Sequence, residues 1–344
     1  MLLAAFVALF LIVSTSSVLL APSIAAEDFR PAAAEFQKLS GVEAHLKNIN
    51  KPSVKIIQAW PKGYNSSADS LAASFQLWRQ SGESCPEGTI PIRRTTEQDI
   101  LRASSVQRFG KKPLKKSVRR DSSGSGHEHA VVFVNGEQYY GARANINVWA
   151  PHVSPELYGD NYPRFFTYWT TDAYRETGCY NLLCSGFVQT NNKIAIGAAI
   201  SPTSYYNGRQ FDMGLMIWKD PRHGNWWLEF GQGVLVGYWP AYLFSHLGSH
   251  ASMIQFGGEV VNTRSTGFHT STQMGSGHFA EEGYGKASYF RNLQIIDWDN
   301  SLLPVSNLRL LADHPNCYDI RQGKNKLWGT YFYYGGPGRN VHCP

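Results

Sequence analysis

The stretch FDMGLMIWK-DPRHG-NWWLEF-GQG-VLVGYW, residues 211–239, decides the fold class. Its segments Phe211–Lys219, Asn225–Phe230 and Val234–Trp239 are rich in apolar, β-branched and aromatic residues, and the connections contain Gly, Pro and Asp. This pattern predicts three β-strands. We expect these strands to belong to an antiparallel all-β domain.

The same pattern extends on both sides of this stretch. Aromatic residues make up 13% of the chain, and 32 Gly and 17 Pro divide it into short segments, with no long helical period after residue 126. These features predict an all-β antiparallel domain, either a sandwich or a barrel. The further predicted strands are Ala130–Val134, Tyr139–Trp149, Arg164–Thr170, Lys193–Ile200, Met253–Asn262, Ala287–Ile296 and Leu327–Tyr334.

The region before residue 108 has a different pattern. Apolar residues recur at helical spacing and predict a helix that ends at Asn50-Lys-Pro52. A second helix is predicted over residues 70–80, and Thr95-Thr-Glu-Gln98 resembles a capping box that opens a short helix through Leu101. The helical spacing in the first of these comes from Phe36, Leu39, Val42, Leu46 and Ile49.

The net charge of +6 comes from one segment. Without its seven basic residues the rest of the chain has a net charge of −1, which argues against a nucleic-acid-binding face. Together with Asp121-Ser-Ser-Gly-Ser-Gly126, this segment predicts a flexible linker and a processing site; an uncut solvated loop is the alternative. The basic residues are Arg108, Lys111, Lys112, Lys115, Lys116, Arg119 and Arg120.

Residues 1–26 are almost wholly apolar and end in Ser23-Ile-Ala-Ala26. An apolar core followed by small residues is typical of a secretory signal peptide, although no Lys or Arg precedes the core here. A membrane anchor is the alternative, because the stretch is nearly long enough to span a bilayer. No later stretch could cross a membrane, so we expect a secreted protein, in the extracellular space or cell wall, without stable membrane insertion.

An oxidising compartment gives the five cysteines a use in disulfides. Local pairing of Cys179 with Cys184 and of Cys317 with Cys343 is the simplest arrangement, although sequence alone cannot fix connectivity. A metal site is the alternative for the first pair, but Tyr-Asn-Leu-Leu between the cysteines offers no histidine. Asn65-Ser-Ser67 is an acceptor for N-glycosylation.

Several short motifs could carry chemistry. His127-Glu-His129 could ligate a metal, but no third ligand is near in sequence. A serine triad lacks a Gly-x-Ser-x-Gly elbow, and Gly335-Gly-Pro-Gly338 is more typical of a turn than of a phosphate-binding loop. Trp226, Trp227 and Trp239 could form a sugar-stacking face, or they could belong to the core.

Gly257-Gly-Glu-Val260 is the strongest candidate site. Two glycines weaken a strand unless something must approach its backbone closely. A carboxylate beside them, Glu259, is therefore a candidate for acid–base chemistry. The alternative is a solvated glutamate at a strand end.

Eight longer motifs, taken together, resemble the neprosin family of plant secreted proteins from about Phe36 to the C-terminus. They are Leu46-Lys-Asn-Ile-Asn-Lys-Pro-Ser-Val-Lys55, Cys85-Pro-Glu-Gly-Thr-Ile-Pro-Ile-Arg-Arg94, Arg164-Phe-Phe-Thr-Tyr-Trp-Thr-Thr-Asp172, Thr177-Gly-Cys-Tyr-Asn-Leu-Leu-Cys-Ser-Gly-Phe-Val-Gln189, Gly224-Asn-Trp-Trp-Leu228, Gly237-Tyr-Trp-Pro240, Gly257-Gly-Glu-Val260 and Met274-Gly-Ser-Gly-His-Phe279.

This resemblance implies a helical activation peptide followed by a β-sandwich of the glutamic peptidase type, which cleaves after proline with a pair of glutamates and no cofactor. One carboxylate activates water, and the other protonates the leaving group or polarises the carbonyl. Glu259 matches the second glutamate. The implied boundaries are a signal peptide at 1–26, an activation peptide at 27–107, a linker and processing region at 108–126 and a β-sandwich at 127–344.

Two segments of the family pattern are missing. The family carries its first glutamate in a Glu-Ala-Gly-Trp strand after the match to Ala144–Trp149, and that strand is deleted here. Glu156 lies close to the deletion but matches a different family position. A second deletion, after Gln58, removes the cysteine that could pair with Cys85.

Two hypotheses follow. The chain is a prolyl endopeptidase of neprosin type, with an activity that the missing glutamate puts in question. Alternatively, it binds proline-rich or glycosylated cell-wall proteins without cutting them, because stiff proline-rich peptides dock on aromatic grooves at low entropic cost. The expected partners are proline-containing peptides and the chain's own activation peptide.

Overall fold

The computed structural model describes residues 12–13, 33–50, 75–80, 82–103, 106, 109–110, 126–153, 158–172, 177–231, 233–262 and 267–344. The predicted signal peptide except Ile12–Val13, most of the predicted linker, Asn65 and Glu156 lie outside these residues. Among the described residues, no helix is both long enough and apolar enough to cross a membrane.

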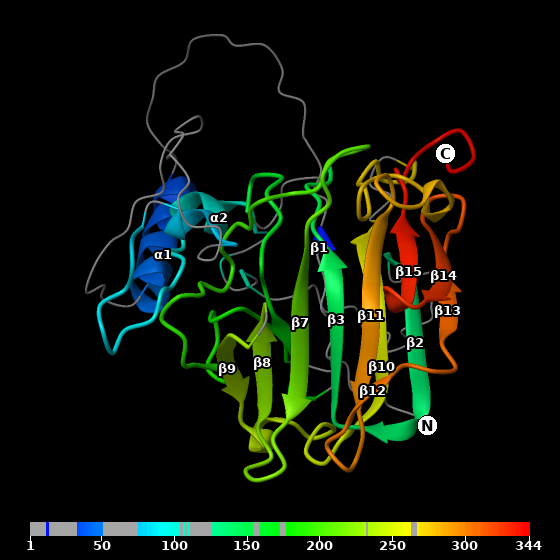
Figure 1. The fold of residues 1–344 in the computed structure, drawn as a ribbon. Helices are drawn as coiled ribbons and strands as arrows, with labels where there is room; N and C mark the ends of the chain where they lie inside the picture. Colours follow the sequence, from blue (N-terminus) through cyan, green and yellow to red (C-terminus); the bar gives the residue numbers. More distant parts are fainter. Residues whose placement is uncertain are drawn as a thin grey trace.

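Two β-sheets face each other, which confirms the predicted all-β sandwich (Figure 1). The smaller sheet has the order β1 (Ile12–Val13), β10 (Ala251–Val261), β2 (His127–Tyr139) and β13 (Arg309–Ala312). Only its β1–β10 pair is parallel. The larger sheet has the order β14 (Asp319–Asn325), β15 (Gly329–Gly335), β11 (Ser288–Ile296), β3 (Gly141–Asn147), β7 (Asp212–Lys219), β8 (Trp226–Phe230), β9 (Leu235–Trp239) and β6 (Val188–Gln189), with β12 (Leu302–Pro304) paired to β11.

The core forms where the two sheets meet. Successive residues of a strand point to opposite faces, so every second residue of β2 and β10 packs inward. Val132 and Phe256 are register partners on this inner face, and both are buried. The larger sheet contributes Leu228 and Phe332, each 0% exposed. Burial of such side chains stabilises the fold by about 1.5–3 kcal/mol each.

The three strands predicted in residues 211–239 are present as β7, β8 and β9, which pair in antiparallel order. The predicted strand Lys193–Ile200 is wrong in the described structure, where the segment has only isolated bridges at Ala199 and Ile200. Asn191 is the physical reason, because its Oδ1 accepts hydrogen bonds from the backbone N–H groups of Lys193 and Ile194 at 2.6 and 3.0 Å. Such local bonds compete with a strand ladder.

Other strands differ from the prediction in extent. The segment Arg164–Thr170 contains only β4 (Tyr168–Trp169), which pairs with β5 (Cys179–Tyr180). The polar edge strand β14 was not predicted, because the sequence Asp-Ile-Arg-Gln-Gly-Lys-Asn lacks apolar alternation. Edge strands often carry such charges, which discourage pairing with other chains.

The helices of the N-terminal region lie on the side of the larger sheet where β8 and β9 are (Figure 1). Helix α1 (Ala33–Ile49) matches the predicted helix. Helix α2 (Glu97–Leu101) has a capping box between Thr96 and Asp99, one residue later than predicted. The segment 70–80 contains, in its described part, a single 3₁₀ turn at Leu77–Arg79.

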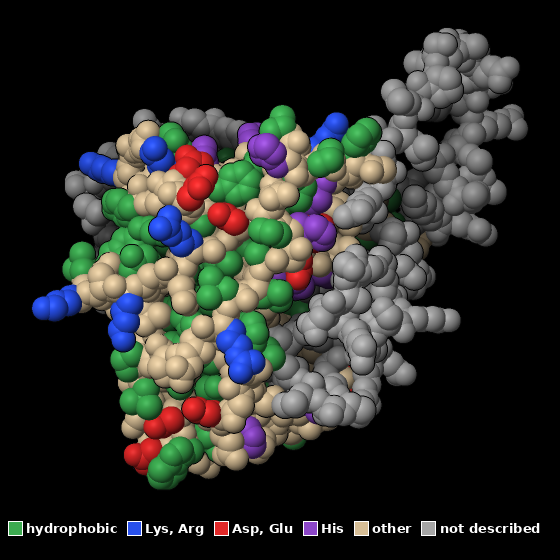
Figure 2. All heavy atoms as spheres, turned by 90° about the vertical axis from the view of Figure 1, so that its right-hand side faces the viewer, with side chains coloured by type: hydrophobic (Ala, Val, Ile, Leu, Met, Phe, Trp, Pro, Cys, Tyr) green, Lys and Arg blue, Asp and Glu red, His purple; other side chains and the backbone are tan. Residues whose placement is uncertain are grey.

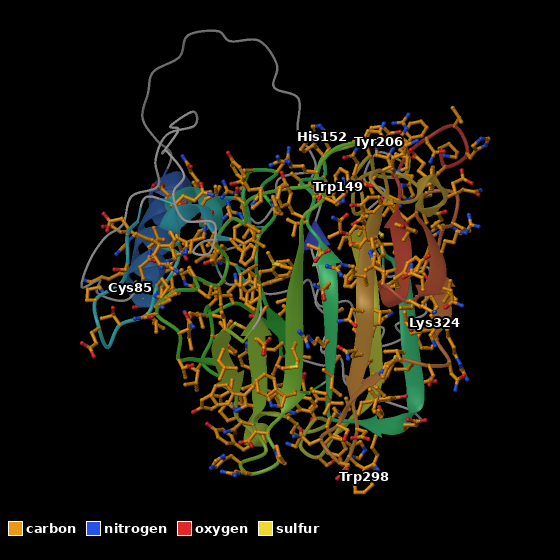
Figure 3. The ribbon with its side chains drawn as sticks, viewed as in Figure 1. Cys85, Trp149, His152, Tyr206, Trp298 and Lys324 are labelled. Atoms are coloured by element: carbon orange, nitrogen blue, oxygen red, sulfur yellow. A yellow bond between two sulfur atoms is a disulfide. The ribbon has the colours of Figure 1, made fainter. Side chains whose placement is uncertain are left out.

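The structure contains the disulfides Cys179–Cys184 and Cys317–Cys343. Cys85 takes part in neither and is partly exposed, near α1 in Figure 3. The first disulfide closes the short loop after β5, and the second ties the turn before β14 to the C-terminus.

Candidate active site

Glu259 lies near the end of β10, and its side chain is 5% exposed. The antiparallel register with β2 places Glu259 opposite His129, Val260 opposite Glu128 and Val261 opposite His127. Residues directly opposite each other share a face of the sheet. Glu259, His127 and His129 therefore lie on one face, and Glu128 lies on the other.

His127 is the contact partner of Glu259. Its Nδ1 atom touches Oε1 of the Glu259 carboxylate, across a sequence separation of 132 residues. The His127 side chain is 26% exposed, so the pair connects a buried carboxylate to a partly solvated imidazole. Carboxylate and imidazole are the two groups most often used for proton transfer near neutral or mildly acidic pH.

The two glycines before Glu259 are required by the protein's own packing. A Cβ atom on Gly257 would lie 2.3 Å from the carbonyl oxygen of Ala130, and the φ angle of Gly257 is +147°. A Cβ atom on Gly258 would lie 2.6 Å from Sδ of Met274. The sequence predicts that something approaches the backbone closely at these two glycines. In the structure, β2 approaches Gly257 and the side chain of Met274 approaches Gly258.

Glu259 is one of the residues around a cavity of about 60 Å³ between the two sheets, although alternation along β10 directs its side chain to the other face. Its walls come from both sheets, and they are mainly apolar. A cavity of this volume can hold a water molecule, because one molecule needs only about 10–15 Å³ of cavity volume. Trp149 lines it at the upper end of the sandwich, near His152 in Figure 3. Other lining residues are Ile146, Phe165, Met213, Gln273, Ser288 and Tyr334.

On either side of Glu259, the described neighbours supply no second carboxylate in register. The partner on β1 is Ile12, and the partner on β2 is His129. Glu128 is the nearest carboxylate along β2, but alternation directs it to the opposite face. Within the described residues, the register partners of Glu259 are thus an isoleucine of the predicted signal peptide and a histidine, and neither is a carboxylate.

The motif His127-Glu-His129 forms ion pairs with four partners. His129 Nδ1 lies 2.8 Å from Oδ2 of Asp313, and Glu128 Oε2 lies 2.7 Å from Nε2 of His269. Burial alone would raise the pKa of Asp313, but the hydrogen bonds from His129 outweigh it and lower that pKa. The two other pairs are Glu128–His314 and His127–Glu259.

These contacts leave little support for the metal hypothesis. The described residues contain one group of three potential metal ligands, formed by His269, Cys317 and Cys343. Both sulfur atoms of that group belong to a disulfide, so they cannot act as thiolate ligands. The motif His127-Glu-His129 is not in such a group.

The three tryptophans that could form a sugar-stacking face do not lie together on one surface. Trp226 and Trp239 are 2% and 5% exposed, so they belong to the core. Trp227 lies on the opposite face of β8, where its ring is 4.8 Å from Tyr238 and 6.4 Å from Trp218. Of the three predicted sugar-stacking residues, only Trp227 is on an outer face.

Fold and site together define a β-sandwich protein with an N-terminal helical region and a buried carboxylate paired with a histidine. A family model described as neprosin matches residues 129–337, and one described as neprosin activation peptide matches residues 34–133. The chain belongs to the neprosin family. The two matches support the resemblance that the motifs around Glu259 and Cys179 indicate.

Proposed function

We propose that this chain is a secreted proprotein whose sandwich domain hydrolyses proline-containing peptides at Glu259. The contact between Glu259 and His127 carries this proposal, because it joins two proton-transferring groups within contact distance of each other. The neprosin resemblance supplies the substrate class. The disulfides are consistent with a secreted protein.

In the proposed reaction, Glu259 acts as the general base and His127 as the general acid. Glu259 takes a proton from water as the water oxygen bonds to the scissile carbonyl carbon. The C–N bond then breaks, and the His127 imidazolium gives a proton to the leaving nitrogen.

Binding without cleavage is the second candidate function. It is favoured by the register between β10 and β2, in which His129, rather than a glutamate, stands opposite Glu259. A site that has lost one acid–base group loses about 10²–10⁴-fold in rate. The sandwich could then hold proline-rich or glycosylated proteins without cutting them.

One experiment separates the two functions. A quenched peptide containing a single proline is incubated at pH 3–6 with the secreted, acid-treated protein, its Glu259→Gln variant and the control Glu282→Gln. Glu282 is a carboxylate paired with His278 away from β10, so its variant tests the effect of a carboxyl-to-amide change alone.

We expect the protein and the control to cleave the peptide, and Glu259→Gln to lose about 10²-fold or more of that rate. Cleavage that survives Glu259→Gln would contradict the assigned role. Peptide binding by folded protein without cleavage, measured by fluorescence anisotropy, would establish the second function. The absence of both would overturn the substrate class.

A further inference from the structure

Glu128 is a buried carboxylate that the proposed reaction does not use. It is 3% exposed and lies on the inner face of β2. Its Oε1 atom accepts a hydrogen bond from Nδ2 of Asn262 at 2.8 Å, and its Oε2 atom lies 2.7 Å from Nε2 of His269. Nδ1 of His314 lies 3.3 Å from the same Oε2 atom.

The hydrogen bonds of His269 fix how many protons this pair holds. Nδ1 of His269 lies 2.8 Å from the carbonyl oxygen of Thr270, which can only accept, so Nδ1 carries a hydrogen. Nε2 and Glu128 Oε2 are then joined by one further proton. Either the imidazolium faces a carboxylate, or a neutral imidazole faces a protonated carboxyl group.

Loss of that shared proton leaves two acceptors facing each other in a buried place. Neither could find a donor in water, because His269 and Glu128 have side chains only 4% and 5% exposed. An unpaired buried polar group is strongly unfavourable. The folded arrangement therefore depends on one proton that the solvent must supply.

We propose that Glu128 and His269 form a proton-dependent latch at the end of the sandwich that carries Glu259. The latch connects three parts of the chain: the start of β2, the connection after β10 that contains His269, and the turn after β13 that contains His314. The inference does not rest on the proposed function, because it concerns the stability of this end of the fold.

Several titratable groups surround the latch. Tyr318 packs against His269 with ring centroids 5.6 Å apart, and burial, together with the charge of Glu128, raises its pKa, so it stays neutral. His314 lies in the turn after β13 and faces the latch, with its Nδ1 atom 3.3 Å from Oε2 of Glu128. On β2 itself, His127 and His129 point to the other face, toward Glu259 and Asp313. Figure 2 shows histidine and acidic side chains side by side on this face of the molecule.

The latch stabilises the folded chain least in strongly acidic and in alkaline solution. Burial alone would raise the pKa of Glu128, but the hydrogen bonds from His269 and Asn262 outweigh it and lower that pKa. The stabilisation from Glu128 is therefore present above the ordinary carboxyl pKa and is lost as the pH falls through the lower folded value. At the other end, an exposed imidazole of the unfolded chain gives up its proton near pH 6.5, while the folded latch must keep one.

The test compares the pH dependence of unfolding in the full chain and its Glu128→Gln variant. Glutamine has the shape of glutamate, and its amide can donate to Nε2 of a neutral His269 while its oxygen accepts from Asn262. The variant therefore keeps the hydrogen bonds without the shared proton. A proton that the folded state keeps and the unfolded imidazole releases near pH 6.5 lowers the equilibrium constant of folding about 16-fold between pH 6.5 and 8.0.

We expect the equilibrium constant of folding of the natural chain to fall, by up to the factor just given, as the pH rises from 6.5 to 8.0. That of Glu128→Gln should stay constant or rise over the same pH range. Asp313→Asn, which alters the neighbouring His129 pair, is the control and should follow the natural chain. Nitrogen-15 NMR of the natural chain at pH 5.5 should show protons on both ring nitrogens of His269 or a proton shared with Glu128.

Parallel pH profiles for the natural chain and Glu128→Gln would overturn the latch. So would a neutral His269 ring whose Nε2 atom has no bonded or shared proton at pH 5.5. If Glu128→Gln does not fold, His269→Gln serves instead, because its amide donates to the carboxylate without titrating. That variant should lose the decline between pH 6.5 and 8.0.

Discussion

The side chain of Gln76 makes two hydrogen bonds with the backbone of Ala195, 119 residues later in the chain. Its Nε2 atom donates to the carbonyl oxygen of Ala195 at 2.7 Å, and its Oε1 atom accepts from the Ala195 N–H at 2.8 Å. Gln76 is 1% exposed, and its backbone forms a bridge with Ile200. A residue of the predicted activation peptide is thus built into the sandwich domain.

Replacing Gln76 with Ala should loosen this connection. The change leaves the buried N–H group of Ala195 without this partner, at about 1–3 kcal/mol, while the C=O group keeps its hydrogen bond from the Ala198 N–H. After cleavage of the linker, the piece carrying Gln76→Ala should separate from the sandwich faster than the natural piece on size exclusion. Gln80→Ala, at an exposed position of the same turn, is the control. Equal retention of both pieces would show that Gln76 does not hold the activation peptide in place.

Replacing His127 with Asn should change the pH profile of peptide cleavage. The variant removes the imidazole that contacts Glu259, so the acid limb and the alkaline limb of the profile should no longer both appear. The expected loss in kcat is about 10²-fold or more, with KM little changed. His129→Asn is the matched control on the same face, because His129 pairs with Asp313. A His127→Asn profile that overlays the natural one would remove His127 from the mechanism.

Alanine at Gly257 should be more harmful than alanine at Gly258. At Gly257 the new Cβ meets the backbone of Ala130 at a positive φ, a strain of about 1–3 kcal/mol before the steric clash is counted. At Gly258 it meets the flexible side chain of Met274, and such overpacking costs about 1–3 kcal/mol. Urea unfolding measures both changes. The effect of Gly258→Ala should shrink in a Met274→Ala background, whereas that of Gly257→Ala should not.

Asp212 should stabilise the protein at neutral pH and lose that effect in acid. Burial alone would raise the pKa of Asp212, but hydrogen bonds from Arg291, Asn145 and Tyr289 outweigh it and lower that pKa. Because the folded pKa is the lower one, the stabilisation is present above about pH 4 and is lost as the pH falls through the folded value. Asp212→Asn should therefore cost about 1.5–3 kcal/mol at pH 7 and less at pH 2–3, measured by urea unfolding. A constant difference across this range would contradict the assignment.

The two disulfides should contribute unequally to stability. Cys317 and Cys343 are 26 residues apart, whereas Cys179 and Cys184 are 5 apart. The entropy of the closed loop in the unfolded chain predicts about 3.5 kcal/mol for the longer loop and about 2 kcal/mol for the shorter. Paired Cys→Ser variants and thermal unfolding test this order. The reverse order would show that contacts within the folded state, rather than loop entropy, dominate.

Alternation of apolar and polar residues predicted most of the larger sheet, because strands such as β7 and β8 bury one face and their turns are rich in Gly, Pro and Asp. The prediction failed where side chains bond the backbone locally, as Asn191 does before Lys193–Ile200. It also missed β14, which is polar and lies at an edge. The first failure comes from local side-chain bonds, and the second concerns a strand whose structure depends on its pairing with β15.

The candidate site shows a similar limit. The glycines beside Glu259 and the family motif were enough to single out that carboxylate, but not its contact with His127. Alternation shows which residues of one strand share a face, whereas the pairing of two strands 132 residues apart depends on the whole sheet.

Strand β2 begins at His127, directly after the predicted processing region. A cut at the end of that region would create a new chain terminus within a residue or two of His127. Its α-amino group, with an ordinary pKa of about 7.7–8.0, would be positively charged in acidic and neutral solution. A cation at this place favours the ionised form of the Glu259 carboxylate. Maturation would then supply a charge to the site as well as release the N-terminal region.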